Sequence, residues 1–243
     1  MKNKIIFTIC LFIYSFIYSF SYAGQMSKRM PGLVALWHLN EGSGSVAIDS
    51  IQEDNNGIIY NCTWATCKYG NGLFFNGANY YVWCCCVPNV SYITAGAWIR
   101  MTGDGSDPDC IIAKSGPNDD QESYQIGRYI NTTTINYPAI LWCQTAVYAG
   151  SAITYDFTKW THFCVTYDGI NVKIYINGNI YRTDSAAYGP IKTSTNHTWL
   201  GCRGYPAAGG ILGYLDEVFL FNKALSATQV RQIYTMSKVK YEK

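Results

Sequence analysis

Short runs in which apolar residues take every second position recur along the chain and predict β-strands. In the first run, Leu33, Ala35, Trp37 and Leu39 alternate with other residues, and side chains two positions apart share one face of a strand. Later runs are rich in β-branched and aromatic side chains, which are typical of strands. These later runs cover residues 93–101, 160–167, 171–176, 179–182 and 211–221.

Two dipeptides between the later runs predict tight hairpin turns. Asp168-Gly169 and Asn177-Gly178 each stand between two predicted strands. Asp, Asn and Gly tolerate the positive φ that short hairpin connections require. Many short strands separated by such turns indicate an all-β sandwich or barrel.

One helix is predicted near the C-terminus. Ser226 is a suitable N-cap, and Gln229 follows three positions later, which is the spacing of a capping box. Val230, Ile233 and Tyr234 recur at the i, i+3, i+4 spacing of one apolar helix face. We therefore expect a short helix after the last strand, followed by a charged tail over residues 237–243.

The N-terminus has the pattern of a signal peptide. Lys2 and Lys4 precede an uncharged run over residues 5–20, and a small-x-small cleavage site follows. We expect residues 1–23 to be removed and the protein to be secreted or associated with the cell surface. The alternative is an uncleaved anchor, but the run is short for a membrane span. We expect no transmembrane span after cleavage.

Charge argues against nucleic acid as a partner. The chain carries 18 Lys and Arg against 16 Asp and Glu, and loss of Lys2 and Lys4 would leave 16 of each. It contains no basic block of the kind that binds phosphate backbones. The 21 Tyr, 10 Phe and 7 Trp residues suit both half-buried strands and binding surfaces.

The cysteines are numerous enough for disulfides in an exported protein. Of the ten, Cys10 lies in the predicted signal, so nine remain and at least one cannot pair within a monomer. Cys62 and Cys67 bracket a short segment predicted to be a loop and are the best local candidates for a disulfide. Residues 84–86 are three consecutive cysteines in a strand-like run, so their side chains are expected to alternate between faces.

Several strings along the chain resemble one known family. They are residues 32–37 (GLVALW), 40–44 (NEGSG), 72–77 (GLFFNG), 159–163 (KWTHF), 166–169 (TYDG), 175–178 (YING) and 215–226 (LDEVFLFNKALS). In this order and spacing they resemble the LamG-like jelly-roll domains of the concanavalin A-like lectin/glucanase superfamily, which are laminin-G-like and related to pentraxins. The resemblance spans residues 31–236.

The resemblance implies a fold and a class of function. It implies a jelly-roll sandwich of two antiparallel sheets packed face to face. It also implies a secreted binding module, and we favour a glycan as the ligand. A module for adhesion or for binding a cell-surface or extracellular protein remains the alternative, because one fold hosts many sites.

The family also implies a structural calcium ion. Calcium takes six to eight oxygen ligands from carboxylates, amides and carbonyls. Asp49 and Asp216 match family positions, and Glu41 and Asn76 are weaker candidates. The alternative is that Asp49 and Asn76 hold turns and that Asp216 pairs with an Arg or with backbone amides.

A glycoside hydrolase is the minor alternative. Enzymes of this fold carry their two carboxylates on one strand as Glu-x-Asp-x-Glu, and this string is missing from the sequence. Asp216 and Glu217 are adjacent, so on a regular strand they would face opposite ways. Glu122 lies in a loop rich in Gly, Pro and Asp that we expect to be solvated. We expect His162 to be a hydrogen-bonded structural residue.

Aromatic residues in predicted loops are the candidates for ligand binding. Sugar rings stack on aromatic faces, and polar neighbours can bind hydroxyl groups. On this basis the candidates are Trp64, Tyr148, Tyr188 and Tyr205. Convergent exposed aromatics would favour glycan binding, whereas a flat apolar patch would favour a protein partner.

Overall fold

The computed structural model describes residues 30–239, apart from residues 78, 106–108, 117–121, 144–145, 150–151, 186–187 and 205–209. In this part of the chain the strands form two sheets, and every strand pair is antiparallel. The predicted signal peptide and its cleavage site lie outside the described residues.

The first sheet has eight strands in the order β15-β14-β13-β7-β17-β5-β4, and β1 pairs with the far end of β17. Its strands are β1 (Leu33–Trp37), β4 (Thr63–Cys67), β5 (Gly70–Asn76), β7 (Ile93–Met101), β13 (Thr161–Tyr167), β14 (Asn171–Ile176), β15 (Asn179–Ser185) and β17 (Leu212–Phe221).

The second sheet has nine strands in the order β11-β10-β9-β8-β16-β6-β3-β2, and β12 also pairs with β10. Its strands are β2 (Val46–Ala47), β3 (Gly57–Tyr60), β6 (Tyr81–Cys84), β8 (Ile112–Lys114), β9 (Tyr124–Ile130), β10 (Thr134–Trp142), β11 (Ala146–Ala149), β12 (Ile153–Thr154) and β16 (Thr198–Leu200).

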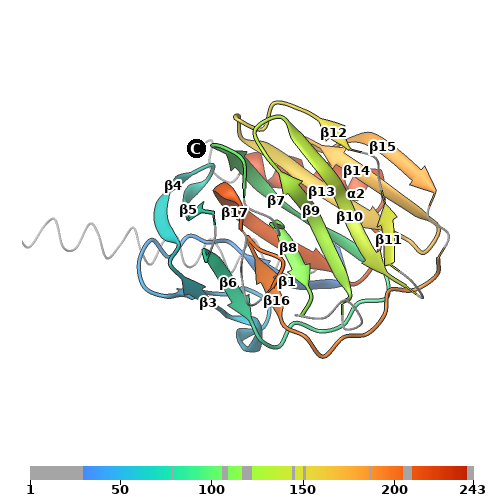
Figure 1. The fold of residues 1–243 in the computed structure, drawn as a ribbon, viewed down its shortest axis with the longest axis horizontal. Coiled ribbons are helices and arrows are strands. Elements are labelled where there is room, and N and C mark those ends of the chain that lie inside the picture. Colours follow the sequence, from blue (N-terminus) through green and yellow to red (C-terminus); the bar gives the residue numbers. More distant parts are fainter. Residues whose placement is uncertain are drawn as a thin grey trace, which may run out of the picture.

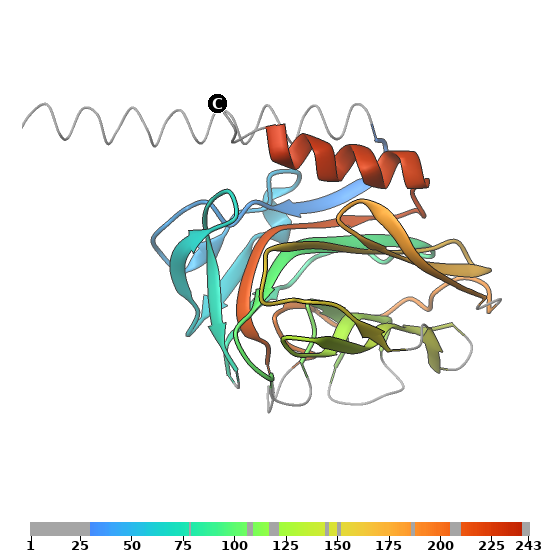
Figure 2. The same cartoon turned by 90° about the horizontal axis from the view of Figure 1, so that it is seen from above.

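The two sheets pack face to face, and a helix covers one of them. Figure 1 shows the nine-stranded sheet in front, and Figure 2 shows helix α2 (Ala227–Val239) lying across the outer face of the eight-stranded sheet. A short 3-10 helix, η1 (Glu53–Asn55), precedes β3. The expected all-β jelly-roll sandwich with one short C-terminal helix is confirmed.

Local patterns predicted several elements closely. Strands β7 and β14 have the predicted bounds, and β13 begins one residue later than predicted. Asn177 and Gly178 adopt φ of 51° and 75° in the β14–β15 turn. In the other turn only Gly169 has a positive φ, and Asp168 instead accepts N–H bonds from Ile170 and Asn171. One turn therefore uses left-handed backbone at both of its residues, and the other uses the Asp168 carboxylate.

The core lies between the sheets. Side chains of both sheets point into it, among them Phe75, Phe163 and Ile174 of the eight-stranded sheet and Val82 and Ile126 of the nine-stranded sheet, all 0% exposed. Burial of apolar area at about 25 cal/mol per Å² is the main stabilising term in such a sandwich. The alternation that predicted the strands therefore also selects the core.

Helix α2 closes a second apolar cluster on the outer side of the eight-stranded sheet. Val230 and Ile233 are 0% and 2% exposed and pack on Leu36, Tyr175 and Phe219. The predicted capping box forms, since the Gln229 N–H donates to Ser226 Oγ at 3.3 Å and the Ser226 N–H donates to Gln229 Oε1 at 3.0 Å. The helix thus hides an apolar sheet face from water.

The helix continues into the segment expected to be a charged tail. Ser237 is 2% exposed, accepts an N–H bond from Trp98 Nε1 at 3.1 Å and donates to the Tyr234 carbonyl at 2.9 Å. The helix extends to Val239 because this contact ties its last turn to β7. The tail boundary expected at residue 237 is therefore wrong for residues 237–239.

A buried carboxylate organises the chain between β1 and β3. Asp49 is 2% exposed and forms an isolated bridge with Trp37. Its carboxylate accepts four N–H bonds of 2.8 to 3.2 Å, donated by Leu36, Ile51, Gln52 and Asn55. Buried N–H groups need such partners, so Asp49 holds η1 and the edge of β1 together.

The imidazole ring of His162 lies under α2, and the residue's only hydrogen bonds among the described residues are those of its main chain, whose N–H donates to Asn177 Oδ1 at 3.0 Å. It is 1% exposed, and neither ring nitrogen has a partner among the described residues. Trp98, Phe219 and Tyr234 surround the ring, with centroids 5.5 to 5.7 Å away. Burial lowers the pKa of His162 to about 3. The histidine is structural, as expected, but packing against aromatic rings and not hydrogen bonding holds its imidazole ring.

Truncating the apolar face of α2 should destabilise the domain. Ile233→Ala removes a buried side chain at the centre of the second cluster, so we expect the free energy of unfolding to fall by about 2–5 kcal/mol. Urea denaturation followed by fluorescence measures this change. Gln232→Ala, on the exposed side of the same turn, should change stability little. Similar losses in both variants would contradict the proposed docking of α2.

His162 should make the domain sensitive to acid. Its folded pKa lies below the ordinary value of about 6.5, so the stability due to the neutral ring is complete above that pH and is lost as the pH falls towards 3. In this window the wild type should lose up to about 1.4 kcal/mol per pH unit more than His162→Gln. Urea midpoints across pH measure the difference, and exposed His197→Gln is the control. Parallel curves for wild type and His162→Gln would refute this assignment.

Removing the Asp49 carboxylate should loosen the segment that follows β1. Asp49→Ala leaves buried N–H groups unpaired, and we expect a loss of about 3 kcal/mol. Asp54→Ala, an exposed carboxylate of η1, is the matched control. Thermal melting in calcium and in chelator should give the same loss, because N–H groups already occupy the Asp49 oxygens. A loss that appears only in calcium would assign Asp49 to a metal instead.

Candidate functional site

The outer face of the nine-stranded sheet is the face that α2 leaves open, as Figure 2 shows. Strand β6 shows how side chains divide between its two faces. Val82 and Cys84 are 0% exposed and join the core, whereas Tyr81 and Trp83 point outward and are half-buried. Large aromatic side chains therefore stand on a surface that no described helix covers.

Neighbouring strands add further aromatic rings to this surface. Across the sheet, Tyr60 of β3 is the register partner of Tyr81, and Trp199 of β16 is the partner of Trp83. His197 directly precedes β16. We call this set the aromatic face: Tyr60, Tyr81, Trp83, His197 and Trp199.

The rings of the aromatic face touch one another. The Tyr60 and Tyr81 rings stack with centroids 4.7 Å apart, and Tyr81 meets Trp199 edge to face at 5.4 Å. His197 stands edge to face against Trp83 at 4.9 Å. These separations are typical of favourable aromatic pairs, so each ring restricts the positions of its neighbours.

Exposure varies across the aromatic face. Tyr60 is 40% exposed, while Trp199 is 7% exposed and donates from Nε1 to the Ser115 carbonyl at 3.1 Å. Trp199 therefore forms a fixed base, and the Tyr60 and His197 rings reach into solvent. Such a surface can stack on the C–H face of a sugar or on a flat apolar group.

A buried ion pair borders the aromatic face. Glu122 is 1% exposed, and its Oε1 accepts an N–H bond from Arg203 Nε at 2.9 Å. Its Oε2 accepts from Gln125 Nε2 at 3.2 Å. The expectation that Glu122 lies in a solvated loop is therefore wrong, because Arg203, 81 residues later, neutralises the carboxylate inside the fold.

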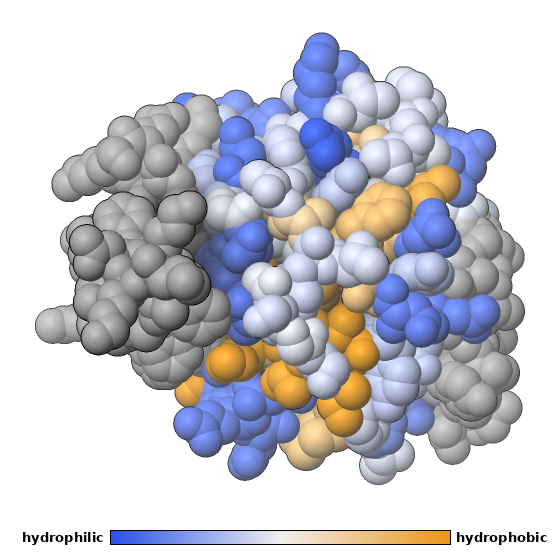
Figure 3. All heavy atoms as spheres, turned by 90° about the vertical axis from the view of Figure 1, so that its left-hand side faces the viewer, coloured by the Kyte–Doolittle hydropathy of each residue, from blue (hydrophilic) through white to orange (hydrophobic). Residues whose placement is uncertain are grey.

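Exposed aliphatic side chains flank the aromatic face. Val46 of β2 and Ile58 of β3 are register partners and are 43% and 40% exposed. Ile58 is also the register partner of Trp83. Figure 3 looks at the left-hand side of Figure 1, where β3 and β4 lie, and shows apolar atoms reaching the surface. Val46 and Ile58 thus add exposed aliphatic surface beside the rings.

The aromatic residues expected to bind ligand do not form a common site in the described part of the chain. Trp64 is half-buried on β4, packs on the core and donates from Nε1 to the Gly44 carbonyl at 2.9 Å. Tyr188 is 53% exposed. The side chain of Tyr148 and all of Tyr205 lie outside the described residues.

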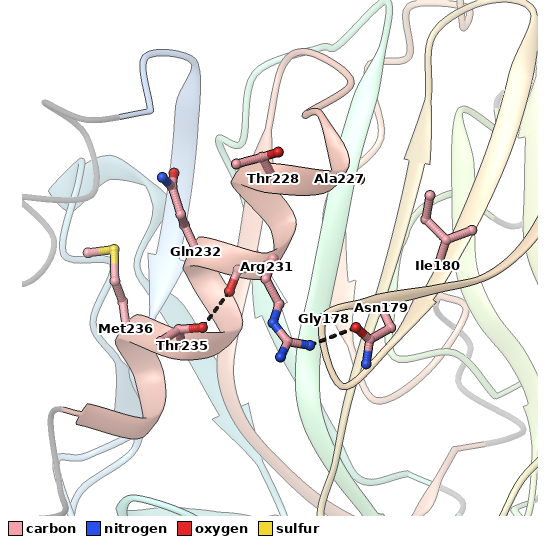
Figure 4. A pocket seen from close by; sticks show the side chains of 9 residues that line it. All are labelled: Gly178, Asn179, Ile180, Ala227, Thr228, Arg231, Gln232, Thr235 and Met236. Carbon is pink, nitrogen blue, oxygen red and sulfur yellow. Dashed lines mark hydrogen bonds between the residues drawn. The ribbon is translucent and has the colours of Figure 1, made fainter.

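A groove runs between α2 and the β14–β15 hairpin, as Figure 4 shows. It encloses about 600 Å³. Arg231 of the helix donates to Asn179 Oδ1 of the hairpin at 2.7 Å, across the groove. Thr235 donates to the Arg231 carbonyl at 2.8 Å. These hydrogen bonds join the helix to the sheet across the groove and within the helix beside it.

The four residues expected to bind calcium lie in separate surroundings. Asp49 is held by the four N–H groups described above, and Glu41 Oε1 accepts from the Ile48 N–H at 2.8 Å. Burial raises the pKa of both carboxyls, although the hydrogen bonds oppose it. Asp216 is 0% exposed and accepts from the Tyr69 N–H at 2.8 Å. Asn76 is exposed at the end of β5.

A calcium ion shared by these residues stays a prediction. Asp49 and Asp216 each accept main-chain N–H bonds, and their donors come from different segments. Within the described ranges, no three His, Cys, Asp or Glu side chains are grouped to hold a metal. The contacts match the alternative stated above, in which Asp49 holds a turn, here through the Ile51 and Gln52 N–H groups, and Asp216 pairs with a backbone amide, that of Tyr69.

The two adjacent carboxylates of β17 are both buried. Glu217 is 3% exposed and lies at a bulge between Asp216 and Phe219, with a φ of 51°. Its Oε2 is 2.8 Å from Nδ1 of His38. The left-handed backbone at Glu217 is one that non-glycine residues rarely adopt, and the His38 contact helps to hold it. Neither carboxylate faces an open surface.

The expected Cys62–Cys67 disulfide is not formed. Both thiols are free, and Thr63–Cys67 is strand β4 and not a loop. Cys62 directly precedes this strand and Cys67 ends it, and because a strand rises about 3.3 Å per residue, the two residues lie too far apart for one disulfide. Among the described residues, none of the other cysteines is bonded either.

The sequence pattern does not reveal the aromatic face as a unit. Tyr81 and Trp83 are two positions apart, and so are Ile58 and Tyr60, which is the signal of an outward-facing aromatic or apolar strand side. That signal does not say which strands are neighbours. Tyr60 and Trp199 are 139 positions apart in the chain and meet on one surface only because β6 lies between β3 and β16.

Comparison with known proteins identifies the family and the fold. The model of the concanavalin A-like lectin/glucanase superfamily in its laminin G form matches residues 85–231. No curated protein matches the chain. No helix in the described residues is both long enough and apolar enough to cross a membrane.

Solved structures with low sequence identity share the fold. Domain 4 of AbnA, an extracellular GH43 arabinanase from Geobacillus stearothermophilus solved with arabinotriose, has a TM-score of 0.60 and 16% identity. The alignment covers 83% of this chain and 98% of that domain.

Two further structures are larger than this chain. Trypanosoma rangeli sialidase, solved with sialic acid, has a TM-score of 0.59 and 17% identity, over 87% of this chain and 34% of the sialidase. The binding domain of botulinum neurotoxin DC, solved with rat synaptotagmin II, has a TM-score of 0.59 and 15% identity. That alignment covers 85% of this chain and 52% of the neurotoxin chain. The chain thus spans about a third and about half of their lengths.

The family match covers more than half of the sequence, and the structural matches agree with two antiparallel sheets packed face to face. The chain therefore belongs to the concanavalin A-like lectin/glucanase superfamily.

Proposed function

We propose that this domain is an exported, non-catalytic module that binds glycans on its aromatic face. The main support is that rings of β3, β6 and β16, in contact with one another, stand on the sheet face that α2 leaves open. Preorganised aromatic rings lose little conformational entropy on binding. A sugar can therefore stack on Tyr60, Tyr81 or Trp83 without rearranging the surface.

The solved structures of the same fold support a sugar as the ligand class. The arabinanase domain was solved with arabinotriose and the sialidase with sialic acid. These ligands belong to those proteins, and the low identity shows the shared fold alone. The choice of a glycan for this chain rests on its own aromatic surface.

A binding role without catalysis fits the surroundings of the carboxylates considered for it. Glycoside hydrolysis needs two carboxyl groups on either side of the scissile bond, with access to substrate. Asp216 and Glu217 are buried and bonded to Tyr69 and His38. Glu122 is buried against Arg203. We therefore assign none of the three to a reaction.

Export and calcium have different support. The signal-like N-terminus supports export to the cell exterior or surface. Calcium is not part of the proposed recognition, because the four expected ligands lie in separate surroundings and none of them belongs to the aromatic face.

A protein partner is the second candidate. The exposed pair Val46 and Ile58 extends the aromatic face with aliphatic surface, and mixed aromatic and aliphatic patches are typical of protein interfaces. The botulinum neurotoxin DC domain was solved with a protein, synaptotagmin II. In this case the ligand would be an extracellular or cell-surface protein, bound by the same face.

Removing one ring should weaken glycan binding. Tyr60 and Tyr92 are both 40% exposed, but Tyr60 belongs to the aromatic face and Tyr92 does not. Loss of a stacked ring costs about 1 kcal/mol or more, so Tyr60→Ala should raise the Kd about fivefold or more. Tyr92→Ala is the matched control and should leave it unchanged.

The measurement begins with a glycan array that includes arabinan oligosaccharides and sialylated glycans. Calorimetric titration of the strongest hit then gives the Kd of the wild type and of both variants, in calcium and in chelator. Equal affinities for the two variants would remove the aromatic face from recognition. An array without hits would favour the protein partner.

A further inference from the structure

Three consecutive cysteines end strand β6, and the structure separates the first from the other two. Cys84 is 0% exposed and faces the core between the sheets. Strand β6 ends at this residue. The expectation that all three side chains alternate between faces is therefore wrong, because Cys85 and Cys86 lie beyond the regular strand.

Cys85 and Cys86 bring their thiols together at the surface. The two sulfur atoms lie 2.6 Å apart, closer than two sulfur atoms that only touch. Cys85 is half-buried and Cys86 is exposed. A bond between them would require no second segment of the chain to approach.

The other cysteines are poorly placed for thiol chemistry. Among the nine described cysteines, Cys86 is the exposed one. Burial raises the pKa of Cys62, Cys84, Cys110 and Cys202 and lowers their thiolate fraction, and burial also raises the pKa of Cys67, to about 12. The thiolate is the nucleophile in disulfide exchange, so a reagent in solution should meet Cys86 first.

The surroundings of the pair favour reaction at Cys86. The ammonium of Lys114, which donates to the Val87 carbonyl at 2.8 Å, interacts electrostatically with Cys86. The contact with Cys86 raises the pKa of Cys85, and Cys86 is the more exposed of the two thiols, so Cys86 is the one that a reagent in solution reaches first.

We propose that Cys85 and Cys86 are a modification site that closes to a vicinal disulfide by exchange with a disulfide oxidant. The Cys86 thiolate attacks the oxidant RSSR, forms a mixed disulfide and releases one RS⁻. Cys85 then loses its proton to solvent and attacks the Cys86 sulfur, which releases the second RS⁻. Two thiols are oxidised, and one RSSR is reduced to two RSH.

The site borders the aromatic face, and its chemistry does not depend on the proposed function. Nδ1 of His197 lies 3.1 Å from the Cys85 carbonyl oxygen, and the His197 ring contacts Trp83. Ring closure would fix the backbone that holds this carbonyl. Oxidation can be measured without any glycan.

Mass spectrometry of the full chain tests the proposal. The folded protein is treated with oxidised glutathione, quenched with acid, unfolded and alkylated with N-ethylmaleimide. Trypsin then releases residues 69–100, a peptide that contains cysteines 84–86 and no others. After oxidation this peptide should carry one alkyl group, on Cys84, and be two hydrogens lighter at Cys85 and Cys86. After reduction it should carry three alkyl groups.

Two variants separate ring closure from other oxidation. Cys85→Ser removes the second thiol, so Cys86 should keep the glutathione as a stable mixed disulfide. Cys62→Ser, which changes a half-buried thiol elsewhere, should still close the ring. Three results on the oxidised wild-type protein would each overturn the proposal. They are three alkyl groups on the peptide, a lasting glutathione adduct on it, or a disulfide that uses Cys84 or a cysteine of another peptide.

Discussion

Packing of α2 on the eight-stranded sheet decides which surface of this domain is available for binding. A two-sheet sandwich has two outer faces, and apolar side chains on both would be costly in water. Here Val230 and Ile233 cover one of them. The aromatic face on the opposite sheet has no such cover among the described elements. The asymmetry of the fold therefore favours the nine-stranded sheet as the binding surface.

Buried polar groups fix the segments where the strand pattern breaks. Asp49 supplies acceptors for N–H groups that no strand partner reaches. Glu217 interrupts β17 with a bulge and meets His38 of the segment after β1. An isolated charge would be costly in these places, and each carboxylate is held by hydrogen bonds. These hydrogen bonds by themselves explain how the two acidic side chains can be buried.

The aromatic face and the Cys85–Cys86 pair share one structural origin. Strand β6 presents Tyr81 and Trp83 outward in regular alternation, and the chain leaves the sheet just after Cys84. The irregular backbone that follows places two thiols side by side next to His197. Binding surface and reactive pair thus lie at consecutive positions of one strand and its exit.

Local patterns in the sequence predicted six of the strands (β1, β7, β13, β14, β15 and β17), the capped helix and the superfamily, because alternation, turn residues and caps act over a few positions. They placed the bounds of β7 and β14 and the contacts of Ser226 with Gln229 correctly. The tertiary structure decided that Glu122 pairs with Arg203, that the extended strand β4 separates Cys62 from Cys67, and that Tyr60 and Trp199 share a surface. These outcomes depend on which strands become neighbours, and the order of strands in a sheet is set by packing of the whole core.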